Sequence, residues 1–163
     1  MSVMSHSSDP LREQLARALD WEEAHVGFDQ AVADMPADKC GAVPGGFAHS
    51  PWQLLEHLRI AQEDILDFSV NPNYVHELNW PEDYWPKSPA PPDRGAWDKS
   101  VASFKRDREK VKELTRQTKD LFAKVPTGKD NHTYLRAILL LIDHNSHHLG
   151  QLVAVRRALG AWK

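Results

Sequence analysis

The chain has 163 residues and a net charge of −3, from 20 Lys and Arg against 23 Asp and Glu, with no basic run. This length suffices for one domain with its own core, and the charge balance argues against a nucleic-acid partner. With one cysteine, no signal-peptide pattern and no apolar run of membrane-spanning length, the sequence predicts a single cytoplasmic domain over residues 1–163 that does not enter a membrane.

The first two helical patterns begin at clear capping signals. Asp9 precedes Pro10, which suits the first turn of a helix, and the amphipathic pattern is predicted to continue unbroken to Pro36. After a connection rich in glycine and proline, Ser50 opens the S-P-x-Q form of a capping box. A second helix is therefore predicted over residues 51–70.

A long connection and two more helical patterns complete the chain. Residues 71–93 contain six prolines, which exclude a regular helix, together with large aromatic side chains. We expect these aromatics to pack the loop onto the body or to cover a site: Trp80, Tyr84, Trp85. The third helix is predicted over residues 95–118 and the fourth over 133–160, where Gly160 is placed to end it in a left-handed turn.

These four long helices predict an all-α fold, and a four-helix bundle accommodates them best. The connection between the second and third helices is long enough to travel the length of the bundle, which would let those two helices run parallel. An all-antiparallel bundle, with the long loop acting as a lid, is the alternative.

Three histidines on two of the predicted helices point into the bundle. His144 and His148 are one helical turn apart on the apolar arc of the fourth helix, and His57 lies at the centre of the apolar arc of the second. Each could be an ordinary hydrogen-bonded core histidine. However, three imidazoles that face one another offer too few complementary donors and acceptors. A divalent metal between them resolves this, and three protein ligands leave a coordination position open to water or substrate.

Two other metal chemistries fit the sequence poorly. The string HNSHH has the outline of H-E-x-x-H, but Asn145 stands where a zinc peptidase has its general base. A di-iron carboxylate site needs paired Glu-x-x-His motifs, and neither Glu56 nor Glu63 is followed by histidine three positions later. Cys40 lies in a glycine-rich loop outside the bundle pattern, and we do not expect it to act as a nucleophile.

The segment HSPWQLLEHLRIAQEDILDF, followed later by YLRAILLLIDHNSHHLGQLVAVRRALGAW, resembles the DinB-like superfamily of metal-dependent four-helix-bundle proteins. The strongest marks are the histidine of LLEHL and the H-x-x-x-H pair before L-G-Q. The resemblance implies an up-down-down-up bundle and an ion held by His57, His144 and His148. It implies nickel or zinc first, with iron or manganese as alternatives. Leu149 departs from the arginine that many relatives have at this position.

The resemblance also implies a class of function. Similar proteins include metal-dependent enzymes that act on small molecules, so a thiol S-transferase using a low-molecular-weight thiol co-substrate, or a hydrolase, is expected. Two alternatives stay open, namely a non-catalytic metal-binding protein of stress response or sensing, and a helical interaction module without metal. Similar bundles commonly dimerise, and a homodimer is an expectation here.

Three further residues are candidates for catalytic roles around the ion. His25 shares a face of the predicted first helix with Trp21 and Phe28, and would line the pocket. Asp64 lies close to the arc of the inward histidine on the second helix, and could orient an imidazole or act as a base. His147 flanks the inward pair on the fourth helix. Two neighbouring polar residues face the same region: Asp143 and Gln151.

Overall fold

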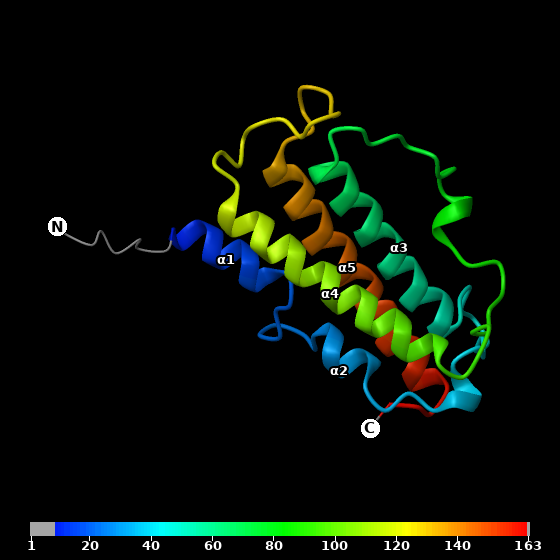
Figure 1. The fold of residues 1–163 in the computed structure, drawn as a ribbon. Helices are drawn as coiled ribbons and strands as arrows, with labels where there is room; N and C mark the ends of the chain where they lie inside the picture. Colours follow the sequence, from blue (N-terminus) through cyan, green and yellow to red (C-terminus); the bar gives the residue numbers. More distant parts are fainter. Residues whose placement is uncertain (1–8, 163) are drawn as a thin grey trace.

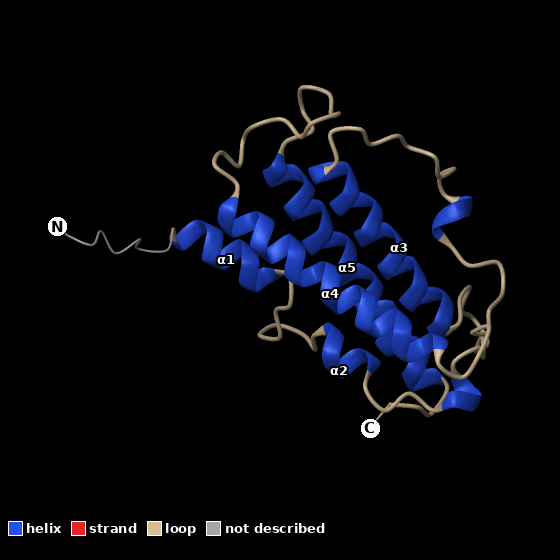
Figure 2. Cartoon of the chain, viewed as in Figure 1, coloured by secondary structure: helices blue, strands red, loops and turns tan. Residues whose placement is uncertain are grey.

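The computed structural model describes residues 9–162, and within that range it is all-helical with no β-strand (Figures 1 and 2). Residues 1–8 and 163 of the predicted domain lie outside the described residues. The predicted all-α fold is therefore confirmed. Five α-helices and two 3-10 turns follow one another along the chain: α1 (Pro10–Ala18), α2 (Phe28–Val32), η1 (Ala37–Lys39), α3 (Pro51–Val70), η2 (Glu82–Tyr84), α4 (Ala96–Gln117) and α5 (Tyr134–Ala158).

The helices α3 and α5 begin within one residue of the predicted positions. The hydroxyl of Ser50 accepts a hydrogen bond from the Gln53 amide at 3.1 Å, and the Gln53 side chain accepts one from the Ser50 amide at 3.1 Å, which completes the capping box of α3. Thr133 caps α5 by accepting from the Arg136 amide at 3.2 Å. Beyond the end of α5, Gly160 adopts a φ of 64°, a left-handed conformation that glycine allows.

The predicted first helix is wrong beyond residue 18. Residues 19–27 are irregular, and the chain becomes helical again only in the short α2. In one continuous helix Leu19 and Phe28 would project about 180° apart. Both are buried in the structure, and Phe28 stacks on Phe104 of α4 with ring centroids 4.0 Å apart. The break allows both side chains to enter the core. The free energy gained by burying them outweighs the loss of a continuous helix.

The long helices lie side by side, and the contacts between them give their relative directions (Figure 1). Near the starts of α3 and α4, the Ser100 hydroxyl donates to the Glu56 carboxylate at 2.6 Å. Further along both helices, the Gln62 side chain donates to the Phe104 carbonyl at 2.8 Å. The two helices therefore run in the same direction, while α1 and α5 run the other way in Figure 1.

The largest apolar core lies at the end of the molecule where α3 and α4 begin. Its fully buried members come from four helices: Ala31 from α2, Leu55 and Leu58 from α3, Phe104 from α4, and Leu152 from α5. The loop that joins α3 to α4 leaves the other end of α3 and runs back beside that helix to this end (Figure 1). None of the described helices is both long and apolar enough to cross a membrane.

Replacing Ser50 with Ala should lower the free energy of unfolding by about 1 to 2 kcal/mol, because two hydrogen bonds disappear from a fully buried position. The hydroxyl both caps α3 and donates to the Pro89 carbonyl. Urea denaturation measures the loss. Thr133→Ala, which removes a cap without a second bond, should cost about 1 kcal/mol. Equal losses in the two variants would show that the bond to Pro89 contributes nothing.

Candidate metal centre

Three imidazoles from α3 and α5 meet at one point. The Nε2 atom of His57 lies 3.0 Å from Nε2 of His144 and 3.0 Å from Nε2 of His148. The ligand atoms of all three lie within 4.8 Å of one another. A tetrahedral zinc ion with bonds of about 2.0 to 2.1 Å holds its nitrogens roughly 3.3 to 3.4 Å apart, which is close to the two distances from His57. The structure thus brings together the three predicted ligands.

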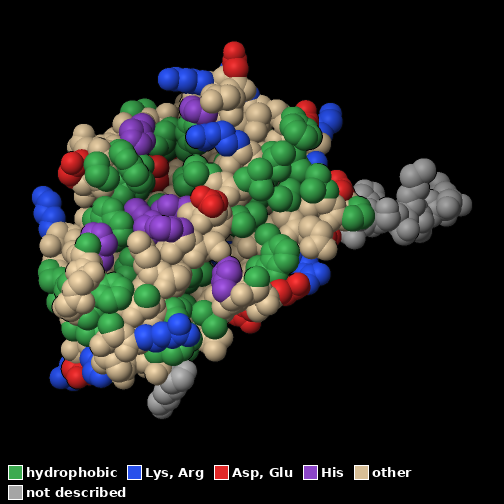
Figure 3. All heavy atoms as spheres, turned by 180° about the vertical axis from the view of Figure 1, so that it is seen from behind, with side chains coloured by type: hydrophobic (Ala, Val, Ile, Leu, Met, Phe, Trp, Pro, Cys, Tyr) green, Lys and Arg blue, Asp and Glu red, His purple; other side chains and the backbone are tan. Residues whose placement is uncertain are grey.

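The helical repeat and the core place these rings. His57 stands between Leu54 and Leu58 on the buried side of α3, and only 1% of its surface is exposed. The two histidines of α5 are one turn apart and only partly buried, so the centre is closed on the α3 side and more open on the α5 side. Figure 3 shows histidine side chains reaching the surface on the face opposite to that of Figure 1.

The outer nitrogen of each ring faces a hydrogen-bond acceptor. Nδ1 of His57 donates to the Tyr84 carbonyl at 2.9 Å, because a carbonyl can only accept. Nδ1 of His148 lies 2.7 Å from the side-chain oxygen of Gln151, and Nδ1 of His144 lies 3.4 Å from that of Asn145. With the proton on Nδ1, the three Nε2 atoms present bare lone pairs to one another. Such a donor set fits a cation at its centre.

Burial keeps these imidazoles neutral. Desolvation lowers the pKa of His57 from its ordinary value of 6.5 to about 4, although the bond to Tyr84 opposes the shift and the neighbouring histidines reinforce it. Desolvation likewise lowers the pKa of His148 to about 4, and it lowers the pKa of His144. Neutral imidazole is the form that binds metal, so protons compete weakly for the site at neutral pH.

The loop between α3 and α4 closes one side of the centre. The ring of Trp85 stacks on His57 with centroids 3.8 Å apart and an interplanar angle of 2°. It also stacks on His49 at 3.8 Å, and Nδ1 of His49 is buried without a hydrogen-bond partner. Sequence reasoning missed His49, because it lies in an irregular segment where no periodicity indicates which way a side chain points.

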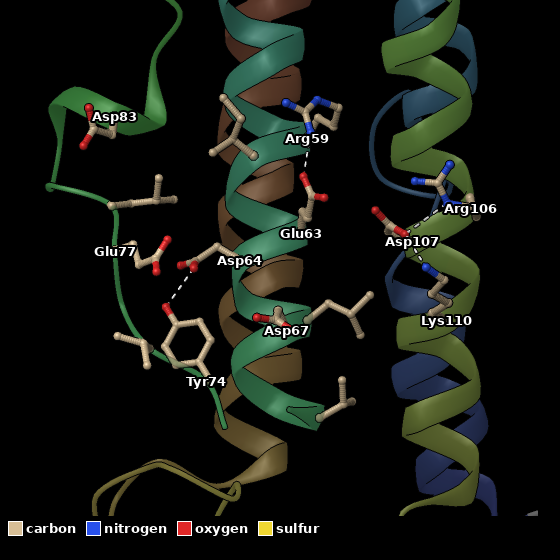
Figure 4. Close-up of a pocket in the computed structure, with 15 residues that line it drawn as sticks. Arg59, Glu63, Asp64, Asp67, Tyr74, Glu77, Asp83, Arg106, Asp107 and Lys110 are labelled. Atoms are coloured by element: carbon tan, nitrogen blue, oxygen red, sulfur yellow. Dashed lines mark hydrogen bonds and ion pairs between the residues drawn. The ribbon is translucent and has the colours of Figure 1, made fainter. Parts of the chain in front are cut away.

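Asp64 lies away from the imidazoles and anchors the loop. Its carboxylate accepts hydrogen bonds from the hydroxyls of Tyr74 at 2.7 Å and Tyr84 at 2.5 Å. These bonds raise the pKa of both tyrosines, although desolvation is the larger cause. Figure 4 shows Tyr74 reaching Asp64 in a cavity of about 750 Å³ between the loop and the helices α3 and α4. Asp64 therefore reaches His57 only through Tyr84, whose carbonyl holds that imidazole.

The other predicted residues are placed as follows. His25 lies in the irregular segment after α1 rather than on a helix, and its Nε2 is 2.7 Å from the hydroxyl of Ser146. Ser146 projects about 200° around α5 from His144, so this contact is on another side of the helix. With Trp21 and Phe28, His25 lines a separate cavity of about 230 Å³. Two more predicted residues are exposed on α5: His147 and Asp143.

Comparison with known proteins yields one match. A family model described as the DinB superfamily matches residues 20–152, a range that contains the three histidines and the loop that covers them. The chain matched none of the curated proteins and none of the solved structures with which it was compared.

The free energy of unfolding of the metal-free protein should fall as the pH is lowered from 6.5 to about 4. In this window the unfolded chain binds protons at His57 and His148 that the folded protein does not bind, because burial lowers the pKa of both. Urea denaturation at several pH values across the window measures the slope. His57→Gln removes one of these groups and should make the slope shallower. The same slope in both proteins would contradict this explanation.

Proposed function

This chain belongs to the DinB superfamily, and we propose that it is a divalent-metal-binding enzyme whose ion is held by His57, His144 and His148. The convergence of three Nε2 atoms, each on a ring whose Nδ1 faces an acceptor, carries the proposal. Three protein ligands leave at least one coordination position for a small molecule, as in catalytic zinc sites. Nickel or zinc is the proposed ion, with iron or manganese as alternatives, since imidazole suits all of these metals.

The proposed reaction is thiol S-transfer with a low-molecular-weight thiol co-substrate, or hydrolysis of a small molecule. A divalent ion held by these histidines would supply a Lewis acid, which would lower the pKa of a bound thiol or water. Trp85 shields one face of His57 from solvent, and Gln151 orients His148 on the more open side. The chain itself need not provide a nucleophile. This agrees with the position of Cys40, whose thiol is buried elsewhere and has its pKa raised by desolvation.

A non-catalytic metal-binding protein of stress response or sensing is the second candidate. One observation favours it. Among residues 9–162, no carboxylate is hydrogen-bonded to the three imidazoles, and the predicted catalytic residues Asp64 and His25 have their contacts elsewhere. A general base would then have to come from His147, from His49 or from the substrate.

The remaining expectations belong to the same proposal. We propose that the chain is one domain with the up-down-down-up four-helix bundle of its family, which the parallel course of α3 and α4 supports. A cytoplasmic location, a small-molecule partner and a homodimer are proposed with it, without nucleic acid or membrane as a partner.

Protein purified without chelators should contain about one divalent ion per chain, measured by elemental analysis. Alanine at His57, His144 or His148 should lower the metal affinity by about 100-fold or more, because only two imidazoles remain. His147→Ala is the matched control. It removes an exposed imidazole next to the centre, and metal content should be unchanged. A parent protein without stoichiometric metal, or equal losses in all four variants, would overturn the proposed site.

Turnover separates the two candidate functions. The metal-loaded protein should transfer a low-molecular-weight thiol to an electrophilic small molecule, or hydrolyse an ester or amide, in a screen of both reaction types. His57→Ala should reduce that rate by about 100-fold or more, and Thr115→Val, which removes a buried hydrogen bond of α4 away from the histidines, serves as the control. A loaded protein whose ion exchanges no ligand with added thiol, and which shows no turnover in the screen, would favour the non-catalytic candidate.

A further inference from the structure

Two buried amides connect the metal centre to the backbone of a third helix. Gln62 of α3 has no exposed surface, and Asn145 of α5 is 4% exposed. The Gln62 side-chain nitrogen donates to the Phe104 carbonyl of α4 at 2.8 Å. The Asn145 side-chain nitrogen donates to the Gln62 side-chain oxygen at 3.2 Å. The oxygen of Asn145 then faces Nδ1 of His144 at 3.4 Å.

The direction of this chain of hydrogen bonds is fixed at its far end. The Phe104 carbonyl can only accept, so Gln62 must point its amide nitrogen at that carbonyl and its oxygen at Asn145. Asn145 must in turn present its nitrogen to Gln62. Its oxygen is then left for His144, and only a protonated Nδ1 can donate to that oxygen. Turning either amide around would bring two acceptors or two donors together in a buried place.

We infer that Gln62 and Asn145 are positioning residues that hold the proton of His144 on Nδ1 and so present its Nε2 lone pair to the metal. The inference rests on the proposed metal site. It also gives a role to Asn145, which stands where a zinc peptidase has its catalytic glutamate and cannot act as a base.

The three ligands are held in three different ways. His57 is fixed by the backbone carbonyl of Tyr84, and His148 by the exposed side chain of Gln151. Only His144 depends on a chain of buried side chains, and the link of 3.4 Å is the longest of the three contacts. Disrupting this chain should therefore alter one ligand and leave the other two in place, which predicts weaker binding rather than loss of binding.

The test replaces Gln62 with Met, which has a similar length but cannot direct Asn145. Zinc affinity, measured by competition with a chromophoric chelator, should fall about 10- to 100-fold while the stoichiometry stays at one. Thr115→Val is the matched control. It also removes a buried hydrogen bond, from a hydroxyl with no exposed surface. Because Thr115 does not belong to the series of hydrogen bonds that ends at His144, this variant should leave zinc affinity unchanged.

A second measurement reports the position of the proton directly. Nitrogen NMR of the metal-free protein at neutral pH should show His144 protonated on Nδ1, and Gln62→Met or Asn145→Leu should shift the population toward the Nε2 tautomer. The double variant should shift the tautomer population no further than Asn145→Leu alone, since both residues act in the same series of hydrogen bonds. Unchanged tautomer and unchanged zinc affinity in Gln62→Met would overturn the inference. A parent protein that binds none of the proposed divalent metals, in which Gln62→Met nevertheless shifts the tautomer, would overturn the proposed function alone.

Discussion

The structure depends on the burial of three imidazoles whose free nitrogens face one another. Without an ion, His57, His144 and His148 bring three lone pairs together in a region largely removed from water, an arrangement that costs free energy. Protonation of one ring would supply a donor between the facing nitrogens, but burial disfavours it because it lowers the pKa of all three rings. The same neutrality makes the rings good metal ligands. The arrangement is therefore unfavourable when empty and favourable when it holds a cation.

The surrounding fold supplies an acceptor for each outer nitrogen. The loop after α3 provides one acceptor, and α5 provides the other two. The orientation of the Asn145 amide is set by its hydrogen bond to Gln62 of α3, which in turn donates to a backbone carbonyl of α4. The loop is held in turn by Asp64, which binds the hydroxyls of Tyr74 and Tyr84. The long connection after α3 is therefore part of the centre rather than a simple link between two helices. Outer partners of this kind fix the orientation and tautomer of metal-binding histidines.

The parts of the molecule that follow a helical repeat could be predicted from the sequence. The capping box at Ser50 marks the start of α3, α5 begins within one residue of its predicted start, and the spacing of 3.6 residues places the three histidines on inward faces. The first helix was predicted too long, because its local pattern gives no sign that Leu19 and Phe28 must both reach the core. The stacking of Trp85 could not be predicted either, since irregular segments have no period from which to infer direction.

Anomalous diffraction tests the central claim most directly. Crystals of protein purified without chelators, measured on both sides of the absorption edge of the metal found by elemental analysis, should show one strong anomalous peak. That peak should lie about 2.0 to 2.1 Å from Nε2 of His57, His144 and His148. A peak at another position, or three imidazoles that face one another without a peak in protein loaded with one equivalent of metal, would contradict the account.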